Sequence, residues 1–325
     1  MLREGTAQLI QRADYTAPAF WIDTVDLTFD LDPAKTRVLN KMRVRRNPDV
    51  AAQPLRLDGD ELNLARVLVN GQGTSFKMDG SQLVLEKLPE GTDAFELEIF
   101  TTCNPAKNTK LMGLYVSNDS FFTQCEAEGF RRITFFLDRP DVMAVYTVTL
   151  RANKAQYPVL LSNGNLVEEG ELDNGRHFAV WSDPFPKPSY LFALVAGQLS
   201  ANRDQFTTMT GKTVDLAIWV AEADLPKTQH AMDALKASMR WDEEVYGREY
   251  DLGQFNIVAV ADFNFGAMEN KSLNIFNSRY ILADPDTATD ADYDAIAGVV
   301  AAKASRPPPL TPPHKGEGDQ MRGRH

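Results

Sequence analysis

The sequence predicts a mainly β domain followed by a smaller, mixed α/β domain. Apolar and polar residues alternate through much of the first two hundred positions, and this period of two is the signature of half-buried strands. Beyond residue 200 the apolar residues also recur at helical spacings. The length of 325 residues is sufficient for two domains that each have a hydrophobic core.

The strand pattern is clearest at residues 25–31, 95–99 and 146–152, where every second residue is apolar. Such alternation places one face of a strand on a core and the other in water, as in antiparallel sheets. The Asn-Gly pairs at 70–71, 163–164 and 174–175 supply the positive-φ residues that hairpins need. Because no helical pattern interrupts this region, we predict an all-β domain over residues 1–198.

The second predicted domain covers residues 199–301 and begins with a strand pattern at 214–220. Asp224 and Pro226 indicate a helix start, and apolar residues follow at 232, 235, 239 and 246. A buried strand is predicted at 255–260. Thr289 and Asp292 form a candidate capping box before a second helical pattern that extends from 293 to 300.

The last segment, residues 302–325, differs in composition from everything before it. Prolines at 307, 308, 309, 312 and 313 cannot continue a helix, and glycines and charged residues fill much of the rest. We therefore expect this tail to be disordered.

Charge and cysteine content limit the partners and the compartment. The formal net charge of -11 argues against a nucleic-acid partner, because phosphate binding requires a basic patch. The two cysteines and the lack of a signal-peptide pattern favour a reducing, cytoplasmic location. The longest apolar runs span about eight residues, so no membrane segment is expected.

Two segments carry candidate chemistry, residues 123–131 and residues 266–270. Gly266 and Ala267 have almost no side chain, so an extended peptide could approach their backbone and add a strand. Glu269 would then meet the end of that peptide, where a carboxylate can accept hydrogen bonds from a free ammonium group. Taken alone, Glu126 and Glu128 are more simply interpreted as solvated acids in a turn.

A family resemblance favours the functional interpretation. GAMEN at 266–270, followed by KSLNIFNSRY, resembles the exopeptidase motif of the M1 (gluzincin) aminopeptidases. TQCEAEGFRRITFFLDRPDV resembles the substrate-binding segment of the bacterial aminopeptidase N branch. DPFPKPSYLFALVAG at 183–197 and SMRWDEEVYGREYDL at 238–252 are similar to other segments of the same branch. The resemblance covers nearly all of residues 8–301. It implies a saddle-like β domain followed by an incomplete thermolysin-like catalytic domain that carries the GAMEN motif.

The resemblance also implies roles for individual residues. Glu126 and Glu269 would clamp the N-terminal ammonium of a peptide substrate, and Gln124 would line the pocket for the first side chain. The other implied substrate-binding residues lie together, with Phe265 at the border of that pocket, Gly266 and Ala267 bonded to the peptide backbone, and Met268 and Asn270 within the same motif.

The family hydrolyses peptide bonds with zinc, which a His-Glu-x-x-His helix and a later glutamate hold. The four histidines of this chain, His177, His230, His314 and His325, do not form that pattern. In register with the family, Ala302 stands at the first ligand position. The resemblance implies that the proline-rich tail at 302–325 is not native to the family. We therefore expect no catalytic and no metal-ligating residue here, and zinc only in full-length relatives.

Three hypotheses follow from this mixture of features. The chain is the N-terminal part of a zinc aminopeptidase, cut by a frameshift, an insertion or a gene-model error, and inactive alone. Alternatively, it is a non-catalytic module that binds peptide N-termini, or one half of a split enzyme whose C-terminal fragment is a separate chain. Since the expected helices of the catalytic domain are missing, we also expect the strands at 214–260 to expose an apolar face.

Overall fold

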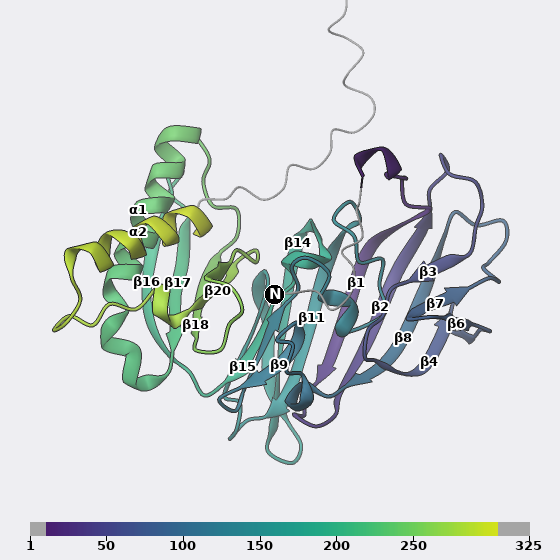
Figure 1. Ribbon diagram of the computed structural model, residues 1–325, viewed down its shortest axis with the longest axis horizontal. Coiled ribbons are helices and arrows are strands. Elements are labelled where there is room, and N and C mark those ends of the chain that lie inside the picture. Colours follow the sequence, from purple (N-terminus) through teal and green to yellow (C-terminus); the bar gives the residue numbers. More distant parts are fainter. Residues whose placement is uncertain (1–10, 305–325) are drawn as a thin grey trace, which may run out of the picture.

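The computed structural model describes residues 11–304, which fold into four β-sheets and two α-helices (Figure 1). The largest sheet has eight strands in the order β13-β14-β11-β1-β2-β8-β4-β5. Its strands are β1 (Phe20–Asp30), β2 (Thr36–Arg46), β4 (Asn63–Val69), β5 (Gln72–Gly73), β8 (Ala94–Cys103), β11 (Met143–Asn153), β13 (Asn165–Leu172) and β14 (Arg176–Pro188).

Two small sheets complete the first part of the chain. One has the order β12-β15-β10-β9 and the other β3-β7-β6. Their strands are β3 (Leu55–Leu57), β6 (Lys77–Asp79), β7 (Gln82–Leu85), β9 (Gly113–Ser117), β10 (Ser120–Gln124), β12 (Val159–Ser162) and β15 (Leu194–Gly197). Short 3₁₀ turns lie at η1 (Arg12–Asp14), η2 (Pro105–Lys107), η3 (Phe130–Arg132) and η4 (Ser189–Leu191).

The predicted alternation matches the observed burial of these strands. The apolar residues of β1, β8 and β11 that recur with period two are all buried in one core. Most pairings in the large sheet are antiparallel, as the alternation predicts. The exception is β1, which pairs in parallel with β11 and places Leu27 opposite Val148.

Two of the three Asn-Gly pairs form the predicted hairpin turns. Residues 70–71 join β4 to β5 and residues 174–175 join β13 to β14, with positive φ at all four positions. The hairpin prediction is wrong for Asn163 and Gly164, because β12 and β13 belong to different sheets. The Asn163 amide instead donates to the carbonyl oxygens of Leu191 and Lys271, so its role is to tie three segments together.

The remaining residues form a five-stranded sheet with two α-helices. Its order is β16-β17-β18-β20-β19, and α1 and α2 lie along it on the side away from the large sheet (Figure 1). The elements are β16 (Ser200–Thr207), β17 (Thr213–Val220), η5 (Glu222–Lys227), α1 (Gln229–Tyr246), β18 (Gln254–Val260), β19 (Ala267–Met268), β20 (Leu273–Asn277), η6 (Ser278–Tyr280) and α2 (Asp290–Ala304). The predicted order, a mainly β region followed by a mixed α/β region, is confirmed.

The expectation that strands 214–260 expose an apolar face is wrong. Leu216 and Ile218 on one face of β17 are buried with the two helices. Ala217 and Trp219 on the other face are buried in the core of the β region. The first part of the chain therefore covers the sheet face that we had expected to meet solvent.

The helix boundaries differ slightly from the prediction. Asp224 and Pro226 lie in a 3₁₀ turn, and the α-helix begins only at Gln229. Tyr246, expected on the apolar face, is the last residue of α1 and is exposed. The capping box is confirmed, since the Thr289 N–H donates to Asp292 and the Asp292 N–H donates to the Thr289 hydroxyl.

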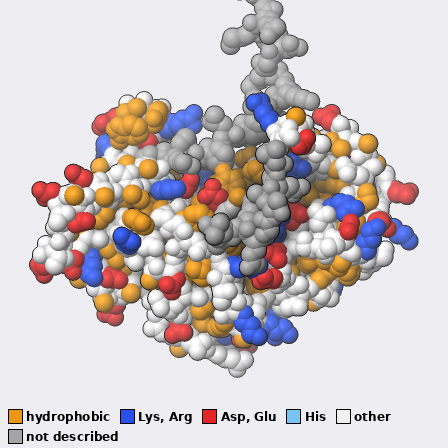
Figure 2. Space-filling model, in the orientation of Figure 1, with side chains coloured by type: hydrophobic (Ala, Val, Ile, Leu, Met, Phe, Trp, Pro, Cys, Tyr) orange, Lys and Arg blue, Asp and Glu red, His pale blue; other side chains and the backbone are white. Residues whose placement is uncertain are grey.

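The predicted domain limits, 1–198, 199–301 and 302–325, stay predictions. Helix α2 continues to Ala304, and the rest of the expected tail lies outside the described residues. Within residues 11–304, no helix combines the length and the apolar character needed to cross a membrane. On the face shown in Figure 2, acidic and basic side chains are interspersed over the described surface.

Candidate functional site

The GAMEN motif lies at the edge of the five-stranded sheet. Strand β19 contains Ala267 and Met268 and pairs only with β20 in that sheet, so its other edge is not occupied by a described strand. Phe265 and Gly266 are exposed immediately before β19, whereas Ala267 and Met268 are buried. A backbone edge beside a small, exposed glycine can accept an added strand.

Contacts with the β region hold the chain on both sides of this motif. Before it, the Asp262 carboxylate accepts a hydrogen bond from the Ser117 hydroxyl at 2.7 Å, and the Tyr115 hydroxyl donates to the Asp262 carbonyl oxygen. Burial raises the pKa of Tyr115 well above its usual value, so this hydroxyl stays protonated as a donor. After the motif, the Ser272 hydroxyl accepts from the Gly164 N–H at 2.6 Å. The motif is therefore positioned by the first part of the chain.

Gln124 ends strand β10 on the same hairpin that holds Asp262. It lies opposite Gly113 in β9, in register with Tyr115 and Ser117 further along that strand. Because directly opposed residues of antiparallel strands share a face, Gln124 lies on the face of the hairpin that contacts Asp262. Its side chain is buried, and its amide donates to the Glu126 carbonyl oxygen at 3.2 Å.

The two acidic residues of this turn are both exposed. The Glu128 carboxylate lies 3.6 Å from the Arg131 guanidinium, which fits a solvated surface pair. Glu126 is exposed directly after the buried Gln124 and Cys125. The structure thus places Gln124 at the end of the hairpin that contacts the chain leading into the motif, and Glu126 two residues further along. A shared contact of Glu126 and Glu269 with substrate stays a prediction.

Glu269 is the charged residue of the motif, and its side chain is only 10% exposed. Its Oε2 atom accepts a hydrogen bond from the Lys303 Nζ atom at 2.7 Å, in the last turn of α2. The neighbouring Asn270 is buried, and neither of its side-chain polar atoms has a hydrogen-bond partner among the described residues. The carboxylate is therefore placed to hold a primary ammonium group in a partly desolvated position.

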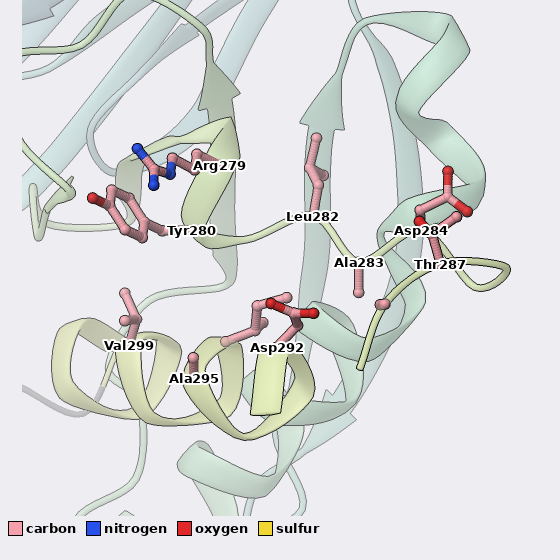
Figure 3. A pocket seen from close by; sticks show the side chains of 11 residues that line it. Arg279, Tyr280, Leu282, Ala283, Asp284, Thr287, Asp292, Ala295 and Val299 are labelled. Atoms are coloured by element: carbon pink, nitrogen blue, oxygen red, sulfur yellow. The ribbon is translucent and has the colours of Figure 1, made fainter. Parts of the chain in front are cut away.

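A pocket of about 410 Å³ lies between residues 279–288 and helix α2 (Figure 3). Tyr280 and Val299 lie near one end of it, and Asp284 and Thr287 near the other. The Tyr280 ring also lies 3.6 Å from the position that a Cβ atom on Gly266 would occupy. The pocket is therefore next to the motif, and its lining residues were not among the site residues predicted from the sequence.

The described residues do not fit a zinc ion. Among residues 11–304, no group of three or more His, Cys, Asp or Glu side chains is arranged to hold a metal. The imidazole of His177 bonds to the Tyr157 carbonyl oxygen and that of His230 to the Tyr293 carbonyl oxygen. His314 and His325 lie outside the described residues.

Lys303 was not among the site residues predicted from the sequence. A signal was present, because Lys303 follows Ile296 by seven positions and Val300 by three, which puts all three on one face of a helix. The contact with Glu269, 34 residues away, has no local signature.

Comparisons with known proteins agree with this geometry. The Peptidase M1 N-terminal domain matches residues 22–191, and the Peptidase family M1 domain matches residues 230–303. Aminopeptidase N of Caulobacter vibrioides is 51% identical over 303 residues, which are 92% of this chain and 34% of that protein. Aminopeptidase N of Escherichia coli is 53% identical over 290 residues, 89% of this chain and 33% of that protein.

A solved structure shows the same arrangement of elements. The crystal structure of Legionella pneumophila aminopeptidase A in complex with aspartic acid matches with a TM-score of 0.85 and 34% identity. The match covers 90% of this chain and 34% of that one. The chain thus spans about a third of the length of these relatives. From its motifs, its fold and these matches, the chain belongs to the M1 peptidase family.

Proposed function

We propose that this chain recognises the free N-terminal amine of a peptide, with Glu269 as the main carboxylate. The observation that carries this proposal is the hydrogen bond of 2.7 Å between the Lys303 ammonium and Glu269. The Glu269 side chain is only 10% exposed, so it already holds a primary ammonium away from most of the solvent. The N-terminus of a peptide presents the same kind of primary ammonium. A charge-assisted hydrogen bond of this type is about twice as strong as a neutral one.

The surroundings of Glu269 suit an extended peptide. Such a peptide would pair its backbone with Gly266 and Ala267 along the edge strand β19, and its amino end would then reach Glu269. The exposed Phe265 ring would border its first side chain, and Gln124 would lie on the opposite wall. Glu126 would supply the second carboxylate of the clamp. These roles rest on the family motif together with the placement of the two segments.

The relatives are aminopeptidases, and we propose that this chain is the amine-recognition part of such an enzyme and is inactive by itself. Zinc-dependent hydrolysis in the family requires a His-Glu-x-x-His helix, and this sequence contains none. Lys303 stands one position after the expected first ligand, and its ammonium is bonded to Glu269. A cytoplasmic location is part of the same proposal, supported by the two buried, free cysteines.

Binding and hydrolysis can be tested separately on the purified chain. NMR chemical shifts of the chain are followed during titration with the tripeptide Ala-Ala-Ala and, separately, with N-acetyl-Ala-Ala-Ala. The ratio of the two dissociation constants measures the preference for a free amine. We expect binding of the free tripeptide alone, and loss of that binding in Glu269→Gln. Equal binding of both peptides contradicts amine recognition, and zinc-dependent release of nitroaniline from alanyl-p-nitroanilide contradicts the proposed inactivity.

A second candidate function is one half of a split aminopeptidase. The observation that favours it is the five-stranded sheet, which the described residues already cover on both faces. Mixing this chain with the remaining two thirds of a relative such as the Escherichia coli protein tests it. Hydrolysis of alanyl-p-nitroanilide by the mixture and by neither part alone is the expected result, whereas an inactive mixture contradicts this candidate.

A further inference from the structure

The last turn of helix α2 places the Lys303 side chain against the edge of the five-stranded sheet. Ile296 and Val300 are buried in the core that the two helices share with the five-stranded sheet. Lys303 lies on the same helical face, one turn beyond Val300. Helix α2 also packs against β19 itself, so the last turn of the helix lies over the motif. The packing of Ile296 and Val300 therefore fixes the backbone position of Lys303 beside the motif.

The ion pair that results is less exposed than a pair of similar length between α1 and β16. The side chains of Lys303 and Glu269 are 26% and 10% exposed. Lys236 and Asp204 form a pair of nearly the same length, 2.6 Å, but with side chains 36% and 40% exposed. Solvent screens the second pair more effectively, so the Lys303–Glu269 pair is the harder one to open.

Lys303 and a peptide N-terminus compete for the same atoms. Both present a primary ammonium, and Glu269 Oε2 is already bonded to Lys303. Because two ammonium groups on one carboxylate oxygen would repel each other, a peptide amine binds there favourably only after the Lys303 ammonium has moved away. Such movement is sterically possible, because Lys303 is in the last turn of α2 and about a quarter of its side chain is exposed.

We propose that Lys303 is an internal occupant of the amine site and sets the affinity of this chain for free-amine peptides. The inference rests on the proposed function, because it assumes that Glu269 binds the substrate amine. We call the site open when the Lys303 ammonium has left Glu269. If only a fraction of molecules is open, the apparent dissociation constant for the peptide equals the constant of the open site divided by that fraction. If the site is open in about a tenth of molecules, removal of the lysine charge tightens binding about tenfold.

The test compares four variants with the wild-type chain in titrations with Ala-Ala-Ala and its N-acetylated twin. Lys303→Met and Lys303→Gln both remove the charge of the side chain. If one of these two variants fails to fold, the other still tests the proposal. Lys303→Arg keeps a cation that can pair with Glu269. Lys236→Met, which opens the similar pair on α1, is the matched control. Thermal unfolding of each variant confirms that the chain is folded.

We expect about tenfold tighter binding of the free tripeptide by the Met and Gln variants, and wild-type affinity for the Arg variant and the Lys236→Met control. Unchanged affinity of the Met and Gln variants overturns the role of Lys303 and leaves amine recognition standing. If neither the wild type nor any variant distinguishes the free from the acetylated tripeptide, the proposed function fails and this inference fails with it. Tightening by Lys236→Met as well would show a general charge effect and would also overturn the inference.

Discussion

A buried ion pair in strand β14 allows a quantitative prediction of how stability depends on pH. The Lys187 Nζ atom lies 3.1 Å from Asp183 Oδ2, and the two side chains are 1% and 0% exposed. The ammonium also lies 3.9 Å from the centre of the Tyr146 ring. Burial lowers the pKa of Lys187 from 10.5 to about 8, although the charge of Asp183 acts in the opposite direction.

This lowered pKa converts into a free energy of unfolding. A shift of this size disfavours the charged lysine in the folded state by about 3 kcal/mol relative to the unfolded chain. The penalty is fully present below pH 8 and disappears as the pH rises to 10.5, because the folded state binds fewer protons than the unfolded state in that window. The pair therefore contributes a gain in stability with rising pH.

Two variants isolate this contribution. Lys187→Met leaves the Asp183 carboxylate buried without its cation and should reduce stability at pH 7 by about 3–5 kcal/mol. The double variant Asp183→Asn with Lys187→Met removes both charges and should stay much closer to the wild type at pH 7. From pH 8 to 10.5, the wild type should gain about 3 kcal/mol relative to the double variant.

Urea denaturation followed by circular dichroism at pH 7, 8, 9 and 10.5 measures these differences. Titrations of other groups occur in both proteins and cancel in the comparison. A constant difference between the wild type and the double variant over this range would refute the account of the lysine. Equal stability of the single and double variants at pH 7 would refute the account of the pair.

Three further outcomes follow from the structure. Gly164→Ala should destabilise the fold by at least about 1 kcal/mol more than Gly211→Ala. Both glycines have positive φ, but a Cβ atom on Gly164 would lie 2.1 Å from the backbone of β14, whereas one on Gly211 would meet nothing within 4 Å. Equal urea midpoints of the two variants would contradict this prediction. Thr289→Ala removes one half of the capping box of α2 and should cost about 1 kcal/mol by the same measurement, whereas an unchanged midpoint would contradict the cap. Burial raises the pKa of Cys103 to about 12 and that of Cys125 well above its ordinary value, so iodoacetamide at pH 8 should label neither thiol until urea unfolds the chain, and rapid labelling of the folded chain would be the contrary result.

The sequence was informative wherever local pattern and local structure agree. Alternation identified the buried faces of β1, β8 and β11, since a strand with one solvated face repeats its environment every two residues. The capping box at Thr289 and the turns at 70–71 and 174–175 were likewise local. Asn163 shows the limit, because the same dipeptide that makes a hairpin elsewhere here joins two different sheets.

Features that depend on contacts between distant segments could not be predicted. The second face of β17 was expected to be exposed, yet the β region covers it, and no pattern within β17 specifies the partner of each face. The charges of Asp183 and Lys187 gave no sign of burial, because neither residue carries a local signal for its surroundings. The Lys303–Glu269 pair could be predicted only in part. Helical spacing places Lys303 on the buried face of α2, but it does not identify Glu269 as the residue that Lys303 contacts.

The central claim is that Glu269 binds a primary ammonium at the end of an extended peptide. The most direct test uses Lys303→Met, which removes the ammonium group bonded to Glu269, and compares Ala-Ala-Ala with N-acetyl-Ala-Ala-Ala by NMR titration. A charge-assisted hydrogen bond contributes about 1.5–3 kcal/mol, so we predict at least about tenfold preference for the free amine, and no preference when Glu269→Gln is added. Equal affinities of Lys303→Met for the two peptides would contradict the account.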